Sequence, residues 1–289
     1  VIALSGETLR ERGVESLGDL TSEVPSFSFV DNGNTKYINI RGVGVNESAP
    51  SSSVGVAVHV DGTYIAREFT FGDAFFDVES VQVLRGPQGT LFGKNTTAGA
   101  VLYATNRPSD ESEGNITARL GNYDRRDLKA VINVPLIDQT LATRLSVSTV
   151  NRDGYTENKF SGEKLNDEER VAATWQLQWL PADTLSTNFN LNWSDTDQKI
   201  RGLKCMIPPD VPGSGWQNAL LDDAVIIPST GKSIQEHCQA AADLGRDEVL
   251  LDDDPLKYIA TTLGASFNVE WELADTMVLK SVTAWRQTE

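Results

Sequence analysis

The chain has few of the residues that most chemistry at a protein site requires. It holds only two cysteines, two histidines and two methionines among 289 residues. No Ser/His/Asp or Cys/His arrangement stands on positioned loops, so we expect no enzyme activity, no resident cofactor and no metal site. His59 has no cysteine or histidine at ligand spacing, and a strand residue is the better interpretation than a metal ligand.

Long apolar runs are also absent. A membrane-spanning helix needs about 20 consecutive apolar residues, and none of that length occurs here. Helical membrane spans are therefore excluded. A membrane location is not, because the strands of a membrane barrel alternate apolar and polar residues and have a low mean hydropathy.

Basic residues are scarce, because the chain has 25 lysines and arginines but 41 aspartates and glutamates, which gives a net charge of −16. A nucleic-acid partner needs a basic face and is excluded. The first residues lack the charged, apolar and small-residue pattern of a secretion signal. We expect that such a signal was removed, or that the chain begins inside a mature protein.

The two cysteines, Cys205 and Cys238, stand in one long irregular segment. Their number and place predict a disulfide formed in an oxidising compartment, with a pair of free thiols as the alternative. Closing this segment would stabilise it by about 3 to 4 kcal/mol in the chain-entropy model. The aspartate run at 252–254 suggests calcium, but its spacing is not that of an EF-hand, and a solvated acidic loop is the better interpretation.

The most informative stretch is residues 81–103. An apolar strand leads into Arg85, a Gly86-Pro87 turn and further glycines, and a second apolar strand follows. The segment does not match a phosphate-binding loop. Glutamine stands at 88, where that motif has its first glycine, and asparagine follows Gly93-Lys94, where the motif has serine or threonine. We expect Gly86 and Gly89 to allow positive φ angles in turns.

The segment Leu-Arg-Gly-Pro-Gln-Gly-Thr-Leu-Phe-Gly-Lys-Asn at 84–95 closely resembles the end of the plug domain of TonB-dependent outer-membrane receptors. Ile40-Arg41-Gly42 resembles a second plug motif, and Asp61-Gly62-Thr63-Tyr64 a third. Residues 6–20 resemble the helical pair of the family. The resemblance implies an α+β plug domain at residues 1–108, in which the turn residues with a structural or gating role are Arg41, Gly42, Arg85, Gly86, Gly89 and Gly93.

Local signals give the elements of this domain. Ser5 is a candidate N-cap for a first helix, and a second helix at 16–24 should stop at Pro25. Strands are predicted near 37–44, 54–60, 81–84 and 100–105, in a mixed sheet.

Arg41 and Arg85 each follow an apolar strand residue. A buried guanidinium must be paired with carboxylates. The resemblance implies pairing with glutamates of a barrel wall, and Glu79 is a local candidate for that pairing. The alternative is that both arginines lie in water at the surface.

After a linker at 109–113, residues 114–289 alternate apolar and polar positions in long segments. Seven strands are predicted, near 114–121, 127–135, 141–150, 170–180, 185–195, 259–273 and 276–287. The turns between these strands at one end are short, at 136–140, 181–184 and 273–276. The connections at the other end are long, at 151–169 and 196–257, and this difference is typical of membrane barrels. A soluble sandwich has strands of about five or six residues, shorter than these.

Tryptophans at the strand ends suggest aromatic girdles. Trp179 and Trp271 should end strands at the periplasmic side, and Trp193 at the external side. Bacterial single-chain barrels close with an even number of strands, and the resemblance implies twenty-two around the plug. We expect that the chain is the front part of a longer antiparallel transmembrane β-barrel in the outer membrane of a Gram-negative bacterium, in contact with its lipid.

The resemblance further implies active transport of a scarce nutrient, most often a ferric siderophore, powered by TonB with ExbB and ExbD through a segment before residue 1. Cobalamin, haem and oligosaccharides are alternative cargoes. A passive porin or adhesin, a secreted carbohydrate-binding or enzymatic domain, and a signalling receptor are alternative proteins. Cargo contacts are expected from the plug apices and outer loops, at Asn46, Tyr64, Arg67 and Trp216.

Overall fold

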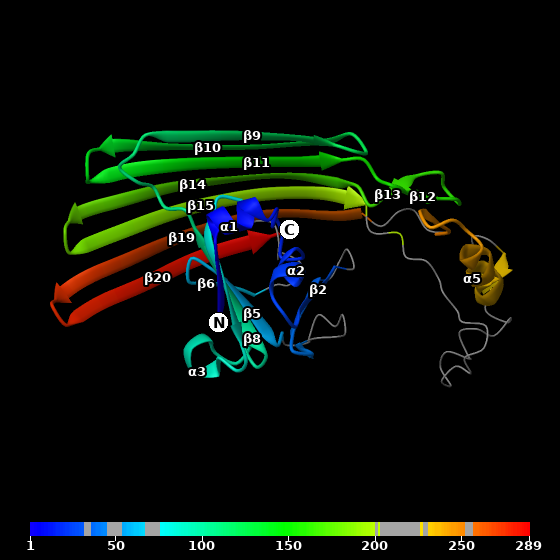
Figure 1. Cartoon of the computed structure of the whole chain (residues 1–289), viewed down its shortest axis with the longest axis horizontal. Helices are drawn as coiled ribbons and strands as arrows, with labels where there is room; N and C mark the ends of the chain where they lie inside the picture. Colours follow the sequence, from blue (N-terminus) through cyan, green and yellow to red (C-terminus); the bar gives the residue numbers. More distant parts are fainter. Residues whose placement is uncertain are drawn as a thin grey trace.

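A computed structural model describes residues 1–31, 36–44, 54–66, 76–199, 202, 226–227, 231–251 and 257–289. Two sheets in residues 1–105 form what we call the N-terminal unit. One long sheet in residues 113–288 forms the wall sheet, and the N-terminal unit lies against one of its faces (Figure 1). None of the described helices is long and apolar enough to cross a membrane.

The larger sheet of the N-terminal unit is mixed, with strand order β1-β7-β8-β5-β6. β5 and β8 run parallel, and the other neighbouring strands run antiparallel. A second, antiparallel sheet joins β2, β3 and β4. The strands are β1 (Ile2–Ser5), β2 (Phe27–Asp31), β3 (Lys36–Ile40), β4 (Val43–Gly44), β5 (Val56–Val60), β6 (Thr63–Ile65), β7 (Val78–Arg85) and β8 (Gly99–Thr105). The predicted α+β architecture is confirmed.

Three short helices accompany these sheets: α1 (Gly6–Glu11), α2 (Leu20–Glu23) and α3 (Gly89–Phe92). Ser5 caps α1 as predicted, because its side chain accepts a hydrogen bond from the backbone N–H of Thr8 at 3.2 Å. This bond satisfies one of the backbone donors that the first turn of a helix leaves without a partner.

The second helix is shorter than predicted. The carboxylate of Asp19 accepts hydrogen bonds from the backbone N–H groups of Glu15 and Ser16. These bonds hold residues 15–19 as a turn, so the helix begins only at Leu20. It ends as predicted, because Val24 precedes a proline and adopts an extended conformation.

One apolar core joins both sheets of the N-terminal unit to the segment of α1 and α2. Its residues with at most 1% exposure include Leu17, Leu20, Ile40, Val81 and Val101. Helix α1 lies directly on the backbone of β7, since a Cβ atom added to Gly6 would stand 2.1 Å from the carbonyl oxygen of Val78. A side chain at position 6 would therefore push the helix off the sheet.

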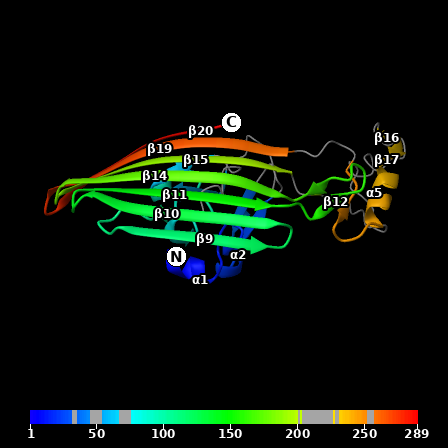
Figure 2. The ribbon, with the colours of Figure 1, turned by 90° about the horizontal axis from the view of Figure 1, so that it is seen from above.

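The wall sheet is antiparallel throughout, with strand order β20-β19-β15-β14-β11-β10-β9 (Figure 2). Its strands are β9 (Glu113–Gly121), β10 (Arg125–Ile137), β11 (Leu141–Arg152), β14 (Glu168–Ala182), β15 (Leu185–Lys199), β19 (Lys257–Ala274) and β20 (Met277–Thr288). Six of them have 12 to 18 residues. The predicted series of seven long antiparallel strands is confirmed.

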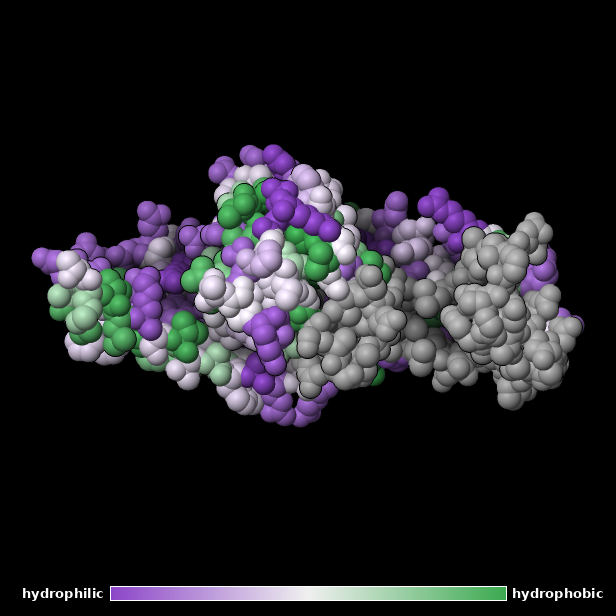
Figure 3. Space-filling view, turned by 90° about the horizontal axis from the view of Figure 1, so that it is seen from below, coloured by the Kyte–Doolittle hydropathy of each residue, from purple (hydrophilic) through white to green (hydrophobic). Residues whose placement is uncertain are grey.

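The wall sheet buries its polar side chains and exposes its apolar ones. Asn133, Ser146 and Gln176 are at most 2% exposed, whereas Trp175 and Phe267 are 40% and 46% exposed. The polar face meets the N-terminal unit, where the side-chain amide of Gln176 donates to the backbone oxygen of Asn106 at 2.9 Å. In the space-filling view, apolar residues gather at the end of the wall that holds the short turns (Figure 3). A soluble antiparallel sheet has the opposite arrangement, with its apolar face against the core.

The tryptophan positions agree in part with the expected girdles. Trp179 and Trp271 pair with Leu141 and Leu185, next to the short turns, as predicted. Trp193 was expected to end its strand, and this is wrong. Strand β15 continues to Lys199, because its backbone keeps pairing with β19 after the apolar pattern stops.

The two long connections at the other end of the wall fold together into one loop module. β12 (Thr156–Asn158) and β13 (Lys164–Leu165) belong to the first connection, and β18 (Glu248–Val249) belongs to the second. β12 pairs antiparallel with β13 and parallel with β18. The second connection also holds β16 (Ile226–Ile227), β17 (Lys232–Ser233) and α5 (Ile234–Ala242), and α5 begins with a capping box between Ser233 and Glu236.

Asn158 holds the loop module together. Its side chain is fully buried. The amide donates to the backbone oxygen of Leu251 at 3.0 Å, and the side-chain oxygen accepts from the N–H groups of Leu251 and Phe160, each at 3.1 Å. One asparagine thus ties the first connection to the second.

We predict that Asn158→Ala weakens the loop module by about 1 to 3 kcal/mol, because it removes the hydrogen-bond partners of the Leu251 and Phe160 backbone groups. Hydrogen exchange should become faster in residues 156–165 and 248–251 together. Lys164→Ala, at an exposed position of the same connection, should leave the exchange unchanged. Faster exchange in only one of the two segments would contradict the shared sheet.

Candidate functional site

The N-terminal unit and the wall sheet meet at a buried ion pair between Asp77 and Arg144. Asp77 stands just before β7 with a φ of 56°, and Arg144 projects from β11. Nε and Nη2 of Arg144 each lie 2.7 Å from a carboxylate oxygen of Asp77. The arginine and aspartate side chains are 9% and 7% exposed. Two parallel charge-assisted hydrogen bonds of this kind are among the strongest polar contacts in proteins.

Three further residues complete what we call the anchor cluster, which comprises Asp77, Asn106, Glu113, Arg144 and Ser146. The hydroxyl of Ser146 donates to Asp77, and so does the amide of Asn106 at 2.7 Å. Nη1 of Arg144 donates to Glu113 at 2.6 Å. Burial acts to raise the pKa of Asp77, but the hydrogen bonds from Arg144, Ser146 and Asn106 outweigh it and hold the pKa below its ordinary value. The stabilisation is thus present above the ordinary carboxyl pKa and is lost only as the pH falls through the lowered value.

A second set of charges joins the turn before α2 to the wall sheet. The carboxylate of Glu15 accepts hydrogen bonds from both terminal nitrogens of Arg119, with Nη1 at 2.6 Å, and from Nζ of Lys129 at 3.2 Å. We call Glu15, Arg119 and Lys129 the clip cluster. Burial acts to raise the pKa of Glu15, but the bonds and charges of the two cations outweigh it and lower the pKa.

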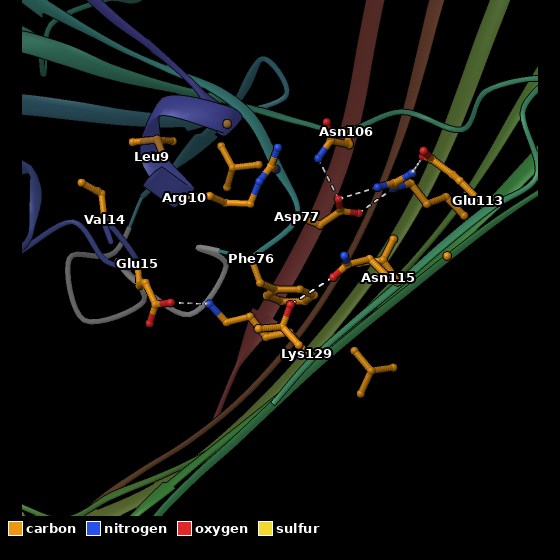
Figure 4. Close-up of a pocket in the computed structure, with 17 residues that line it drawn as sticks. Leu9, Arg10, Val14, Glu15, Phe76, Asp77, Asn106, Glu113, Asn115 and Lys129 are labelled. Atoms are coloured by element: carbon orange, nitrogen blue, oxygen red, sulfur yellow. Dashed lines mark hydrogen bonds and ion pairs between the residues drawn. The ribbon is translucent and has the colours of Figure 1, made fainter. Parts of the chain in front are cut away.

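A cavity of about 510 Å³ lies between α1 and strands β9 to β11. Asp77, Asn106 and Glu113 stand at one side of it, Glu15 and Lys129 stand at another, and the ring of Phe76 lies between these groups (Figure 4). The lining is mixed in charge and partly apolar. It can therefore hold water and polar solutes.

A second cavity of about 300 Å³ lies nearer the long connections, beside Arg125, Glu168 and Arg170. Glu15, Phe76 and Lys129 line both cavities. The clip cluster therefore stands between them.

The opposite side of the N-terminal unit packs closely against the wall sheet. Lys36 of β3 is 7% exposed, and its Nζ lies over the ring of Tyr258 of β19, 5.6 Å from the centroid. The cavity between the β5–β6 hairpin and strands β19 and β20 measures only about 50 Å³. Of these two cavities between described residues, the one beside α1 is the larger.

Tyr64, a predicted cargo contact, takes part in the packing of the N-terminal unit. Its hydroxyl accepts a hydrogen bond from the side-chain amide of Asn95 at 2.8 Å, and its ring lies 5.5 Å from that of His59. Burial lowers the pKa of His59. The role of Tyr64 toward cargo stays a prediction.

Arg41 and Arg85 make no ion pair within the part of the chain that the structure describes. Arg41 is exposed in the turn between β3 and β4, and its backbone N–H donates to the oxygen of Ser26 at 2.7 Å. Arg85 is half-buried, with its Nε lacking a partner among the described residues. Glu79 is therefore not its local partner, and the pairing of both arginines with wall glutamates stays a prediction.

The glycines of the motifs differ in their backbone conformation. Gly42, Gly86 and Gly93 have φ angles of 75°, 100° and 83°, in the left-handed region that disfavours other residues. Gly89 was expected to share this feature, and that is wrong, because it is the first residue of α3. The gating role of these positions stays a prediction.

Several predicted residues fall outside the described ranges: Asn46, Arg67, Cys205 and Trp216. Cys238 is described, lies buried in α5 and is disulfide-bonded. Within the described ranges no group of three or more histidine, cysteine, aspartate or glutamate side chains could hold a metal ion.

The sequence patterns did not identify Asp77, Arg144 or Glu15 as contact residues. Alternation places Arg144 on the polar face of its strand. Its partner stands 67 positions earlier, just after a segment without a regular pattern. An inward-facing charge in a wall strand was the available signal, because such a charge needs a partner inside.

Comparison with known proteins agrees with this architecture. Residues 1–100 match the family model described as the TonB-dependent receptor plug domain. The pesticin receptor of Yersinia pestis is 28% identical over 159 residues, which are 55% of this chain and 24% of that protein. The ferrioxamine B receptor of Salmonella typhimurium strain SL1344 is 30% identical over 158 residues, which are 54% and 19%. The matched region thus spans a quarter or less of either relative.

Solved structures show the same fold. The ferric yersiniabactin uptake receptor FyuA from Yersinia pestis superposes with a TM-score of 0.79 at 20% identity, over 99% of this chain and 40% of that one. The open form of the ferric-catecholate import receptor Fiu from E. coli K12 gives a TM-score of 0.71 at 18% identity, over 99% and 38%.

Three observations agree on the architecture. The N-terminal unit matches the plug model, the wall strands have a polar face toward that unit, and both parts superpose together on solved receptors. Residues 1–100 of the chain are therefore a plug domain of the TonB-dependent receptor type, and the antiparallel strands that follow have the fold of the solved receptors' strands.

Proposed function

We propose that the protein takes up a ferric siderophore across the outer membrane of a Gram-negative bacterium, with energy supplied through TonB. One observation carries this proposal: a plug domain is held by buried charge against the polar face of a wall whose apolar face points outward. An exposed apolar band of this kind suits lipid. Moving such a plug away from the wall separates buried charges and therefore needs an input of energy.

The cargo class is inferred from the relatives. Their names include a ferrioxamine B receptor, a catecholate siderophore receptor and a ferric yersiniabactin uptake receptor. Iron chelates are common to these names. This favours a ferric siderophore over cobalamin, haem or an oligosaccharide.

Transport by this route needs binding and displacement, without covalent chemistry. Cargo would bind at the end of the wall that carries the long connections. Asn46, Tyr64, Arg67 and Trp216 remain the predicted cargo contacts. TonB, with ExbB and ExbD, would then move the plug and free a passage. The family is one of receptors rather than of enzymes.

A passive porin is the alternative function, and the plug domain argues against it. The two functions differ in their energy requirement. A porin passes solutes down their gradient, whereas a TonB-dependent receptor stops when TonB is absent.

We predict that the intact protein restores uptake of at least one radioiron-labelled siderophore to a bacterium that lacks its own receptors. A panel of hydroxamate, catecholate and mixed chelates should be tested, because the chelate class is not fixed by the chain. The same strain without TonB is the control and should take up none. Uptake that persists without TonB, or transcription induced by a sugar and not by iron starvation, would contradict the proposal.

We further predict that the outward face of β9 contacts lipid. Ile116 is 77% exposed on that face, and its neighbour Thr117 lines the cavity on the inner face. Ile116→Arg should destabilise the protein folded in lipid by about 2 to 4 kcal/mol, because a guanidinium enters hydrocarbon. Thr117→Arg is the matched control and should cost much less. Urea titration of the intact protein in vesicles measures both, and equal losses would contradict the assignment.

A further inference from the structure

The anchor cluster and the clip cluster both hold the N-terminal unit, which is the plug, to the wall sheet. They differ in how deeply their side chains are buried. In the anchor cluster Asp77 and Arg144 are 7% and 9% exposed. In the clip cluster Glu15 and Arg119 are 29% and 44% exposed. Water and salt screen an exposed pair, whereas separation of a buried pair leaves uncompensated charge. The clip cluster is therefore the easier of the two to open.

The clusters also differ in their place along the chain. Asn106 and Glu113 of the anchor cluster flank the connection between β8 and β9. The anchor thus holds the plug where the backbone also joins it to the wall sheet. Glu15 stands in the turn between α1 and α2, across the cavity from this junction (Figure 4). A rotation about the junction would move Glu15 away from the wall.

The plug is built to move as one body in such a rotation. Leu9 and Leu20, on either side of Glu15, belong to the same core as Val81 and Val101. Pulling the helical segment away from the sheet would expose these apolar side chains to water. Opening the clip cluster by moving the whole plug leaves the core intact.

The clip cluster separates two cavities. Glu15 and Lys129 line both the cavity of about 300 Å³ near the long connections and the cavity of about 510 Å³ beside α1. On the opposite side of the plug the cavity against β19 and β20 measures about 50 Å³. Parting Glu15 from its two cations would join the larger cavities into one space along the inner face of β9 to β11.

We propose that the clip cluster is the gate of the transport route and that the anchor cluster is the fixed pivot about which the plug turns. This inference rests on the proposed uptake function. Cargo first occupies the cavity beside Arg125 and Glu168, and it enters the larger cavity when Glu15 leaves Arg119 and Lys129. The three clip residues are positioning residues, because they act by holding the plug in place.

Reversible bridging of cysteine pairs in the intact protein tests the gate. Glu15→Cys with Lys129→Cys, joined by a short bis-methanethiosulfonate, should lower siderophore-iron uptake by about tenfold or more, because the gate cannot open. Binding of the chelate to whole cells should not change. A thiol reductant should restore uptake, and the parent protein treated in the same way corrects for effects on its own disulfide.

Two further pairs are matched to this one. Thr105→Cys with Gln176→Cys bridges the plug to the wall beside the anchor and leaves all five anchor residues in place, and uptake should stay within about twofold of the parent. Ala172→Cys with Ser194→Cys bridges two register partners of the wall alone, outside both clusters, and should also stay within about twofold. Uptake that survives bridging of the clip, or is lost on bridging beside the anchor, would overturn the assignment.

A charge exchange tests the gate without cargo or TonB. Glu15→Lys places a third cation beside Arg119 and Lys129, and channel openings in planar bilayers should become about tenfold more frequent, because like charges repel. Adding Lys129→Glu restores an opposite charge beside position 15 and keeps Arg119 against Asp127, so it should return the frequency toward that of the parent. If Glu15→Lys behaves like the parent, the clip is not a gate. If the parent fails to take up any chelate while the conductance responds as expected, the uptake proposal fails and the gate assignment stands.

Discussion

The buried guanidinium of Arg144 is the interaction on which the arrangement of plug and wall depends. A wall that turns its apolar face outward must turn its polar face toward the plug, and every charge on that face needs a partner. Asp77 is the main partner of Arg144 and accepts two hydrogen bonds from it. Glu113 accepts a third hydrogen bond from the same guanidinium. The plug is therefore held by polar contacts that are specific in direction, whereas packing of apolar surfaces would allow it to slide.

Alternation and turn chemistry made much of the fold predictable. Outward tryptophans and inward amides define the wall strands, since a period of two places every second residue on one face. Trp175 and Gln176 lie next to each other in sequence and on opposite faces in the structure. In the plug, Ser5 signals the start of α1, and the motif ending at Asn95 identifies the strand pair β7 and β8.

The contacts between plug and wall were not predictable from local patterns. Asp77 and Arg144 are far apart in the sequence, and no local pattern around either residue indicates the other as its partner. Arg85 and Glu79 stand in the same strand, yet the two do not pair, because six residues of an extended strand separate them by about 20 Å. Strand β15 extends beyond the residues that alternate apolar and polar, because its backbone pairing with β19 continues through polar residues up to Lys199.

The parallel pairing of β12 with β18 joins two connections that emerge from different hairpins of the wall. Insertions or deletions in one of them would shift the register of a strand that the other needs. The two paired strands are therefore constrained to keep matching lengths, because a residue gained or lost within one of them removes a backbone partner of the other.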